Sequence, residues 1–181
     1  ETVLRYIILG LILAGFFQVF FWITQDNKVT LKQNTSERFE SLSYAPFDGY
    51  DKKVLSPEQI KEDIGILLNY TNRVRTYATA DAKVILEVAS KTNMMVDLGL
   101  WLSGDHEENH KEIQRGLELL KKYPNNINNV IVGNETLLRT DLNEVELMAY
   151  LDFVREFTKK PITTAEVWHT LDKYPEIGNH V

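Results

Sequence analysis

The chain has 181 residues, 44% of them hydrophobic, and carries 20 Lys and Arg against 26 Asp and Glu, for a formal net charge of −6. This composition is that of an ordinary globular domain with a sizeable core, and an acidic balance without a Lys- or Arg-rich block argues against nucleic-acid binding. The absence of cysteine excludes disulfides, thiolate metal sites and a cysteine nucleophile, but it does not fix the compartment.

The first segment, residues 1–24, is predicted to be a transmembrane helix. Residues 3–24 are almost entirely apolar, and a helix needs roughly 20 such residues to cross the hydrocarbon core of a bilayer. A cleaved signal peptide and a buried core helix are the alternatives. The stretch exceeds the roughly 7–15 apolar residues of a signal peptide, and residues 19–22 offer no small-residue cleavage site. Arg5 and Trp22 suit the two membrane interfaces, so we expect an anchor in the lipid bilayer, with an orientation that charge alone does not decide.

The rest of the chain divides into a polar linker, residues 25–38, and one folded domain, residues 39–181. Runs rich in β-branched, aromatic or aliphatic residues are candidate strands at 39–44, 73–77, 94–101, 129–132 and 162–167. Amphipathic stretches with helical spacing separate them, at 57–69, 80–91, 107–123 and 143–159. The domain therefore alternates strands with helices.

One helix boundary has an explicit signal, the sequence Ser56-Pro57-Glu58-Gln59. Ser is a favoured N-cap, Pro is favoured at the first helical position, and Gln three residues after the cap completes a capping box. The sequence therefore predicts a helix that begins at Pro57.

The alternation of strands and helices predicts a parallel sheet, for which two architectures compete. A doubly wound sheet usually carries a Gly-rich phosphate-binding loop after its first strand, and residues 45–50 (APFDGY) contain no such motif. In a (β/α)8 barrel the chemistry lies in the loops after the strands, where the unusual polar and aromatic residues of this chain fall. Because a complete barrel takes roughly 250 residues, the predicted fold class is α/β, a truncated (β/α)8 barrel of five strands. His180-Val181 is a candidate start of a sixth strand.

The strongest candidate for catalysis is Glu135, which follows Asn134 at the end of an apolar run. A carboxylic acid that is shielded by barrel walls has its charged form disfavoured, as a general acid near neutral pH requires. Asn134 is placed to hydrogen-bond a sugar hydroxyl, a contact that strengthens in the transition state of glycoside cleavage. Gly-Asn-Glu also occurs in ordinary solvated turns, so the prediction depends on its place at the end of the fourth strand.

Five motifs follow one another at the predicted strand ends. They are Ser43-Tyr-Ala-Pro-Phe-Asp-Gly49, Val74-Arg-Thr-Tyr77, Gly99-Leu-Trp-Leu102, Val132-Gly-Asn-Glu-Thr-Leu-Leu-Arg139 and Thr164-Ala-Glu-Val-Trp-His169. In this order they resemble the bacterial branch of glycoside hydrolase family seventeen. That branch is often the extracytoplasmic part of a membrane protein fused to a family-two glycosyltransferase that makes β-glucans. The resemblance implies a (β/α)8 barrel with its acid/base after strand four, which Glu135 matches, and its nucleophile after strand seven, at a position beyond Val181.

The resemblance implies a retaining β-glucan glycosidase or transglycosylase, anchored in the cell membrane with its barrel on the extracytoplasmic side and working within a larger glucan-synthesising protein. Retaining glycosidases need only two carboxyl groups, roughly 5–5.5 Å apart, so neither a metal nor an organic cofactor is expected. Without its nucleophile, the chain of 181 residues is predicted to be inactive by itself. The alternative is a non-catalytic carbohydrate-binding or scaffolding barrel at the membrane.

Besides Glu135, eight residues are predicted to contact substrate: Asn134, Glu166, Trp168, Tyr77, Arg75, Trp101, Tyr44 and Asp48. Glu166 is expected to bind a sugar hydroxyl or tune Glu135, with structural pairing and the role of nucleophile as the alternatives. The aromatic rings are candidates either for stacking on sugar faces or for core packing. Arg75 is expected to orient a catalytic carboxylate or to form a buried ion pair. Asp48 is expected to bind a hydroxyl or to make an Asp-Gly turn.

Overall fold

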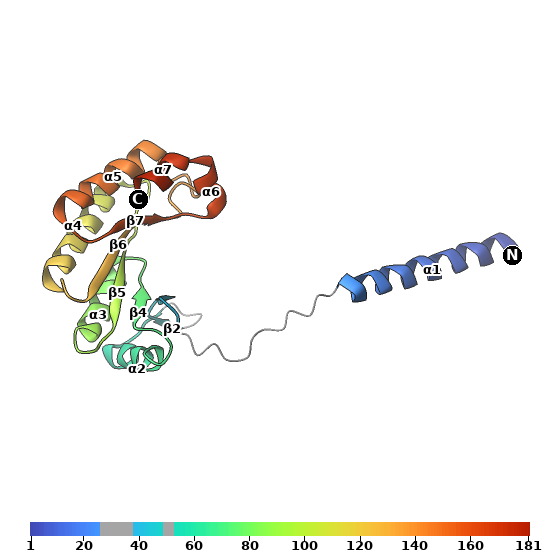
Figure 1. Cartoon of the computed structure of the whole chain (residues 1–181), viewed down its shortest axis with the longest axis horizontal. Helices are drawn as coiled ribbons and strands as arrows, with labels where there is room; N and C mark the ends of the chain where they lie inside the picture. Colours follow the sequence, from blue (N-terminus) through green and yellow to red (C-terminus); the bar gives the residue numbers. More distant parts are fainter. Residues whose placement is uncertain (26–37, 49–52) are drawn as a thin grey trace. The chain divides into compact units, whose positions relative to one another are not determined.

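The computed structural model describes residues 1–25, 38–48 and 53–181, and the chain separates into two units, Glu1–Ser36 and Glu37–Val181. Helix α1, Thr2–Gln25, makes up the first unit (Figure 1). Its segment Thr2–Thr24 contains an 18-residue window with a mean hydropathy of 2.3, and it is long and apolar enough to cross a membrane. A signal sequence and the core helix of a soluble protein can have the same length and composition, so these two properties do not decide between them and an anchor. The predicted linker lies outside the described residues, except at its two ends.

The second unit is built on a five-stranded parallel sheet whose strands are adjacent in chain order. The strands are β1 (Leu42–Ser43), β4 (Arg73–Arg75), β5 (Met95–Leu100), β6 (Ile127–Asn134) and β7 (Ile162–Ala165). The chain between β1 and the first helix of this unit adds an antiparallel pair, β2 (Phe47–Asp48) and β3 (Lys53–Val54), that was not predicted. Each of the five predicted strands is thus present in the sheet, with shifted ends.

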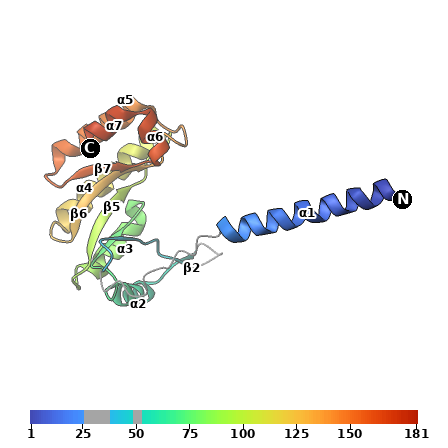
Figure 2. The ribbon, with the colours of Figure 1, turned by 45° about the vertical axis from the view of Figure 1, so that its right-hand side comes forward.

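The predicted helices connect the parallel strands: α2 (Pro57–Leu67), α3 (Thr79–Ala89), α4 (His106–Lys122) and α5 (Glu144–Phe157). Helix α2 packs on α3, α3 on α4 and α4 on α5, so that the helices cover one face of the sheet in succession (Figures 1 and 2). A doubly wound sheet would reverse its strand order and carry helices on both faces. The arrangement is therefore an arc of a (β/α) barrel, as predicted.

Local capping and burial explain why these segments adopt their structures. The predicted box at α2 is present: Gln59 N donates to Ser56 Oγ at 3.3 Å, and Ser56 N donates to Gln59 Oε1 at 3.0 Å. Aliphatic side chains of the helices and strands fill the core between them, among them the fully buried Ile64, Leu98 and Leu147. Burial of such a side chain stabilises the fold by about 1.5–3 kcal/mol relative to leaving it exposed.

The prediction that His180-Val181 opens a sixth strand is wrong. After β7 the chain forms two short helices, α6 (Trp168–Lys173) and α7 (Pro175–His180). Pro175 stands at the first position of α7, and Ile177 is fully buried. The His180 carbonyl accepts a hydrogen bond from Arg155 Nη2 of α5 at 2.8 Å, which holds this end of the chain in a helix against α5.

Candidate active site

The C-terminal ends of β4 to β7 carry most of the residues that were predicted to form the site. Arg75 ends β4, Trp101 follows β5, and Glu166 follows β7. Asn134 ends β6, and Glu135 comes directly after it. Because the strands are parallel, these ends lie along the same edge of the sheet, where active sites of (β/α) barrels are formed. The structure thus brings together residues that are up to about 90 positions apart in the sequence.

The backbone around Glu135 is held in an unusual conformation. Gly133 has a φ of 81°, and a Cβ atom there would lie 3.0 Å from Thr136 Cγ2, so this position favours glycine. Glu135 itself has a φ of 54°, in the left-handed region that costs a non-glycine residue on the order of 1–3 kcal/mol. Its amide donates to the Ala165 carbonyl at 2.7 Å, and its carbonyl accepts from the Arg139 amide at 2.9 Å.

The Glu135 carboxylate, in contrast, has no partner within the described part of the chain. The side chain is half-buried, and no described residue donates a hydrogen bond to it or pairs with its charge. A strained residue whose backbone is fixed while its functional group stays free is typical of a group that acts on a ligand.

The second carboxylate at this edge, Glu166, binds the loop that carries Glu135. It accepts hydrogen bonds from Thr136 Oγ1 at 3.1 Å, from Leu137 N at 2.9 Å and from Leu138 N at 3.4 Å. These contacts favour the structural-pairing alternative for Glu166. Contact between Glu166 and a sugar hydroxyl stays a prediction.

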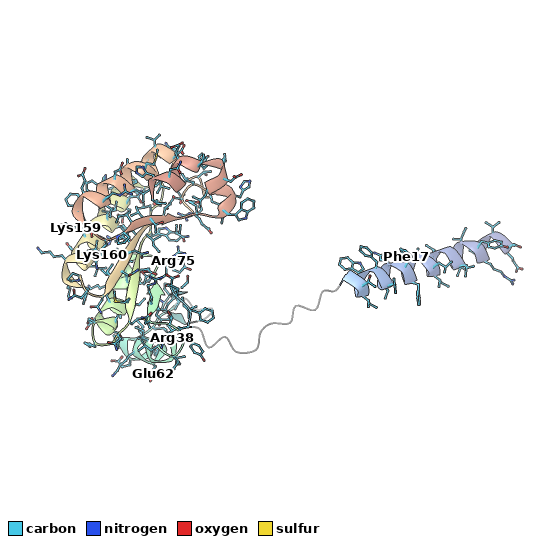
Figure 3. All side chains as sticks on the ribbon, in the orientation of Figure 1. Phe17, Arg38, Glu62, Arg75, Lys159 and Lys160 are labelled. Atoms are coloured by element: carbon cyan, nitrogen blue, oxygen red, sulfur yellow. The ribbon has the colours of Figure 1, made fainter. Side chains whose placement is uncertain are left out.

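Arg75 lies inside the arc of strands and reaches from β4 to the end of β6 (Figure 3). Its Nη2 donates to Asn134 Oδ1 at 2.5 Å, and its guanidinium lies 4.9 Å from the centroid of the Tyr77 ring. Arg75 forms no ion pair with any described residue, and its buried Nε has no described partner. Among the described residues, Arg75 therefore contacts the Asn134 amide and the Tyr77 ring. A role of Arg75 toward a catalytic carboxylate stays a prediction.

The other predicted contact residues differ in what they present. Trp101 is 41% exposed and Trp168, at the start of α6, is 78% exposed, so both have ring surface available to a ligand. Tyr44 instead packs against the core, and its hydroxyl donates to Asp63 Oδ2 of α2 at 2.7 Å, which favours the packing alternative. For Asp48 the structure describes only the backbone, in β2, and Gly49 lies outside the described residues.

Sequence reasoning assigned no role to Arg139, which closes the motif of residues 132–139. The Arg139 side chain donates to the carbonyls of Asn134 and Leu102, pairs with Asp141 at 2.7 Å, and lies 4.4 Å from the centroid of the Trp101 ring. An arginine four positions after a candidate acid, directly after Leu137 and Leu138, is the signal that marks it in the sequence.

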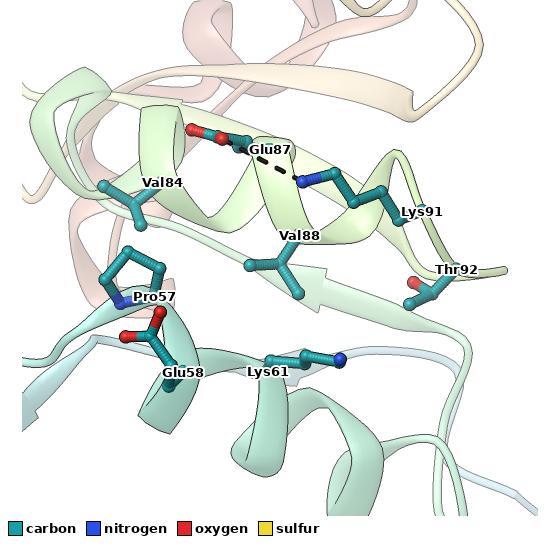
Figure 4. Close-up of a pocket in the computed structure, with 8 residues that line it drawn as sticks. All are labelled: Pro57, Glu58, Lys61, Val84, Glu87, Val88, Lys91 and Thr92. Atoms are coloured by element: carbon teal, nitrogen blue, oxygen red, sulfur yellow. Dashed lines mark ion pairs between the residues drawn. The ribbon is translucent and has the colours of Figure 1, made fainter.

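A groove of about 380 Å³ lies elsewhere, between α2 and α3 (Figure 4). It is lined by Pro57, Glu58, Lys61, Val84, Glu87, Val88, Lys91 and Thr92, and its ion pair joins Glu87 Oε1 to Lys91 Nζ at 4.0 Å. No residue predicted for the site lines it. The groove therefore does not compete with the strand ends as the candidate active site.

Solved structures of glucan-active proteins resemble this chain. The glycoside hydrolase family 17 β-1,3-glucanosyltransferase from Rhizomucor miehei has a TM-score of 0.67 and 26% identity, over 79% of this chain and 54% of that one. An active-site mutant of the same enzyme in complex with laminaritriose has a TM-score of 0.68. An endo-laminarinase from Formosa, at 21% identity and a TM-score of 0.62, shares the fold.

Curated relatives and a family profile agree with this likeness. The probable glucan endo-1,3-beta-glucosidase btgC of Aspergillus clavatus is 28% identical over 62% of this chain and 18% of its own length. The glucan 1,3-beta-glucosidase of Schizosaccharomyces pombe is 30% identical over 59% of this chain and 37% of its own. The chain thus spans about a fifth of the length of the btgC relatives. The profile of the BtgE/BtgC glycoside hydrolase domain matches residues 41–181, and the chain belongs to this family.

Proposed function

We propose that this domain cleaves or transfers β-1,3-linked glucose polymers by a retaining mechanism in which Glu135 is the acid/base. The observation that carries the proposal is Glu135 itself, a carboxylate without a described partner on a strained, hydrogen-bonded strand end. Family membership supports it, as does the laminaritriose bound by the solved neighbour at 26% identity. Trp101, Trp168, Tyr77 and Asn134 would line the sugar site.

In the first step, Glu135 donates its proton to the glycosidic oxygen as the bond from that oxygen to the anomeric carbon breaks. A second carboxylate forms a bond to the same carbon and gives a glycosyl-enzyme. In the second step, the oxygen of water, for hydrolysis, or of a sugar hydroxyl, for transfer, forms a bond to the anomeric carbon and gives its proton to the Glu135 carboxylate. The bond between that carbon and the second carboxylate breaks, which frees both carboxyl groups for the next cycle. Because Glu166 is bound to the loop after Glu135, we do not assign the nucleophile to it. A nucleophile beyond Val181 stays a prediction.

The substitution that tests Glu135 is Glu135→Gln in the intact protein, assayed on β-1,3-gluco-oligosaccharides. Loss of a general acid–base group typically costs about 10²–10⁴-fold in turnover. The loss should be smaller on a nitrophenyl glycoside, because a nitrophenolate leaves without protonation. Glu118→Gln, at an exposed glutamate of α4, is the matched control and should keep full activity.

Two outcomes would contradict this proposal. Unchanged turnover in Glu135→Gln would remove the residue from the mechanism. Oligosaccharide binding without turnover by the unmodified intact protein would support the alternative of a carbohydrate-binding or scaffolding barrel. Product analysis then separates hydrolysis, which shortens the chains, from transfer, which also lengthens them.

We also propose that α1 anchors the protein in the cell membrane with the barrel on the extracytoplasmic side, as part of a larger glucan-synthesising protein of the bacterial branch. The apolar character of Thr2–Thr24 along its whole length supports an anchor. In cells, the intact protein should stay in the membrane fraction after alkaline carbonate washing, and external protease should reach the barrel. A mature N-terminus located after α1 would identify a signal sequence instead.

A further inference from the structure

We propose that Arg139 is a positioning residue, which sets the separation between Glu135 and the Trp101 ring. The inference rests on the proposed function for its catalytic consequence, and on the contacts of Arg139 for its geometry. Regular pairing between β5 and β6 ends at the partners Leu100 and Val132. Beyond that pair, no ladder hydrogen bonds hold the two strand ends at a fixed distance.

Beyond the last ladder pair, the Arg139 side chain connects the two strand ends. Its Nη2 donates to the Leu102 carbonyl, just after β5, at 2.9 Å, and its Nη1 donates to the Asn134 carbonyl at the end of β6. Leu102 directly follows Trp101 in the chain, and Asn134 directly precedes Glu135. A planar guanidinium with five donors is suited to such bridging, whereas a lysine ammonium binds as a point charge.

Two further contacts fix the guanidinium itself. Asp141 Oδ2 accepts from Arg139 Nε at 2.8 Å and neutralises its charge, with both side chains nearly three-quarters buried. The guanidinium also lies over one face of the Trp101 ring, with its central carbon 4.4 Å from the ring centroid. A cation over an indole face is attracted by the negative potential of the ring face. Trp101 is thereby held in one orientation, and its other face is the one left for a sugar.

The backbone of Arg139 adds a direct connection to the acid, because its amide donates to the Glu135 carbonyl at 2.9 Å. One residue therefore binds Glu135 through its backbone and the Trp101 loop through its side chain. A shift of that side chain displaces the ring that holds the sugar relative to the acid that protonates it. Misplacement by about 1 Å can cost on the order of 10²-fold in rate.

The first test measures turnover of the intact protein with Arg139→Lys. We expect kcat on β-1,3-gluco-oligosaccharides to fall about 10- to 100-fold, with a smaller fall on a nitrophenyl glycoside that needs no protonation. Arg155→Lys is the control and should keep full kcat, because Arg155 likewise binds an aspartate, Asp152, and a backbone carbonyl, that of His180, but outside the candidate site. Full kcat in Arg139→Lys, or equal losses on both substrates, as a smaller folded fraction would give, would overturn the proposal.

The second test needs no activity. In the intact protein, every tryptophan except Trp101 is replaced by Phe, Trp22 and Trp168 among them, so that the fluorescence of Trp101 reports on the guanidinium that covers it. Arg139→Lys and Arg139→Gln should raise the acrylamide quenching of Trp101 in the absence of sugar, and Arg155→Lys should not. Unchanged quenching in both Arg139 variants would overturn the proposal. If the unmodified protein does not act on β-glucan, the proposed function fails and the quenching still decides the role of Arg139.

Discussion

Two carboxylates of the barrel, the buried Asp97 and the half-buried Glu166, have different partners. Asp97, in β5, is 5% exposed. Its carboxylate accepts hydrogen bonds from Ser41 Oγ, just before β1, at 2.9 Å and from Asn128 Nδ2 of β6 at 3.1 Å. Arg73 Nε lies 3.3 Å from it without hydrogen-bond alignment. Glu166, after β7, binds mainly backbone amides, and all of them belong to the single loop after Glu135.

The comparison separates two tasks along the strands. Asp97 ties β1, β4 and β6 together toward their N-terminal ends, where polar contacts of a barrel serve stability. Glu166 holds a loop at the C-terminal ends, where contacts shape the site. We therefore expect substitution of Asp97 mainly to lower the stability of the domain and substitution of Glu166 mainly to slow the reaction.

The largest expected effect is on stability, in Asp97→Asn. The introduced side-chain amide carries no negative charge beside Arg73, and its NH2 group is a donor that points toward Ser41 or Asn128. The free energy of unfolding should therefore fall by about 3 kcal/mol. Denaturant titration measures it. Asp152→Asn is the control, because the Asp152 side chain is 58% exposed and its pairs with Arg155 and His180 are surface pairs that are each worth at most about 1 kcal/mol. If the two variants have equal free energies of unfolding, Asp97 does not have the stabilising role assigned to it.

Glu166→Gln should affect the reaction more than the fold. The amide keeps one acceptor oxygen but loses the charge that strengthens the bonds from Leu137 N and Leu138 N. We expect kcat of the intact protein on β-1,3-gluco-oligosaccharides to fall about tenfold and the free energy of unfolding to fall by only about 1 kcal/mol. If stability falls as far as in Asp97→Asn while kcat of the folded protein is unchanged, Glu166 has the same task as Asp97.

The sequence predicts those parts of the molecule that depend on local patterns. The capping box at Ser56 lies within four residues, and the strand–helix alternation is a short-range periodicity, so both are found where expected. The place of Glu135 follows from the apolar run before it. The short antiparallel pair β2–β3 and the turn-like helix α7 have too few residues to show a periodicity.

The roles of Glu166 and Arg139 depend instead on contacts between distant segments. Glu166 and Thr136 are 30 positions apart, and Arg139 and Leu102 are 37 apart. These contacts form only in the observed register of β5, β6 and β7, which includes an irregularity between Ile131 and Asn134. Such a register cannot be read from a single sequence. For Glu166, sequence reasoning therefore leaves structural pairing and substrate contact as open alternatives.

Tyr44 extends the comparison to the other edge of the sheet, where the side chain serves packing. Burial, the hydrogen bond to Asp63 and the negative charge of Asp63, in that order, raise the pKa of Tyr44. A phenol whose pKa is higher in the folded state stabilises the fold fully below its unfolded pKa of about 10. That stability is lost as the pH rises further.

Tyr44→Phe should therefore remove part of the alkaline loss of stability, and near neutral pH it should cost about 1 kcal/mol of unfolding free energy for the lost hydrogen bond. Thermal unfolding between neutral pH and pH about 11 measures both effects. Activity should be unchanged. A clear rise in KM would place Tyr44 in the sugar site, as first predicted, and would contradict the packing role.

The smallest expected effect on the fold belongs to Trp168, two residues after Glu166. Because the ring is 78% exposed, Trp168→Ala should change the free energy of unfolding by no more than about 0.5 kcal/mol. If the ring stacks on a sugar, KM for β-1,3-gluco-oligosaccharides should rise about threefold to tenfold in Trp168→Ala, because the variant loses an aromatic contact worth roughly 1 kcal/mol of binding free energy. Phe157→Ala, at an aromatic ring 58% exposed at the end of α5, should leave KM unchanged. Equal KM values in the two variants would remove Trp168 from the site, and Glu166 would then be the last residue of this segment that acts on the reaction, through the loop after Glu135.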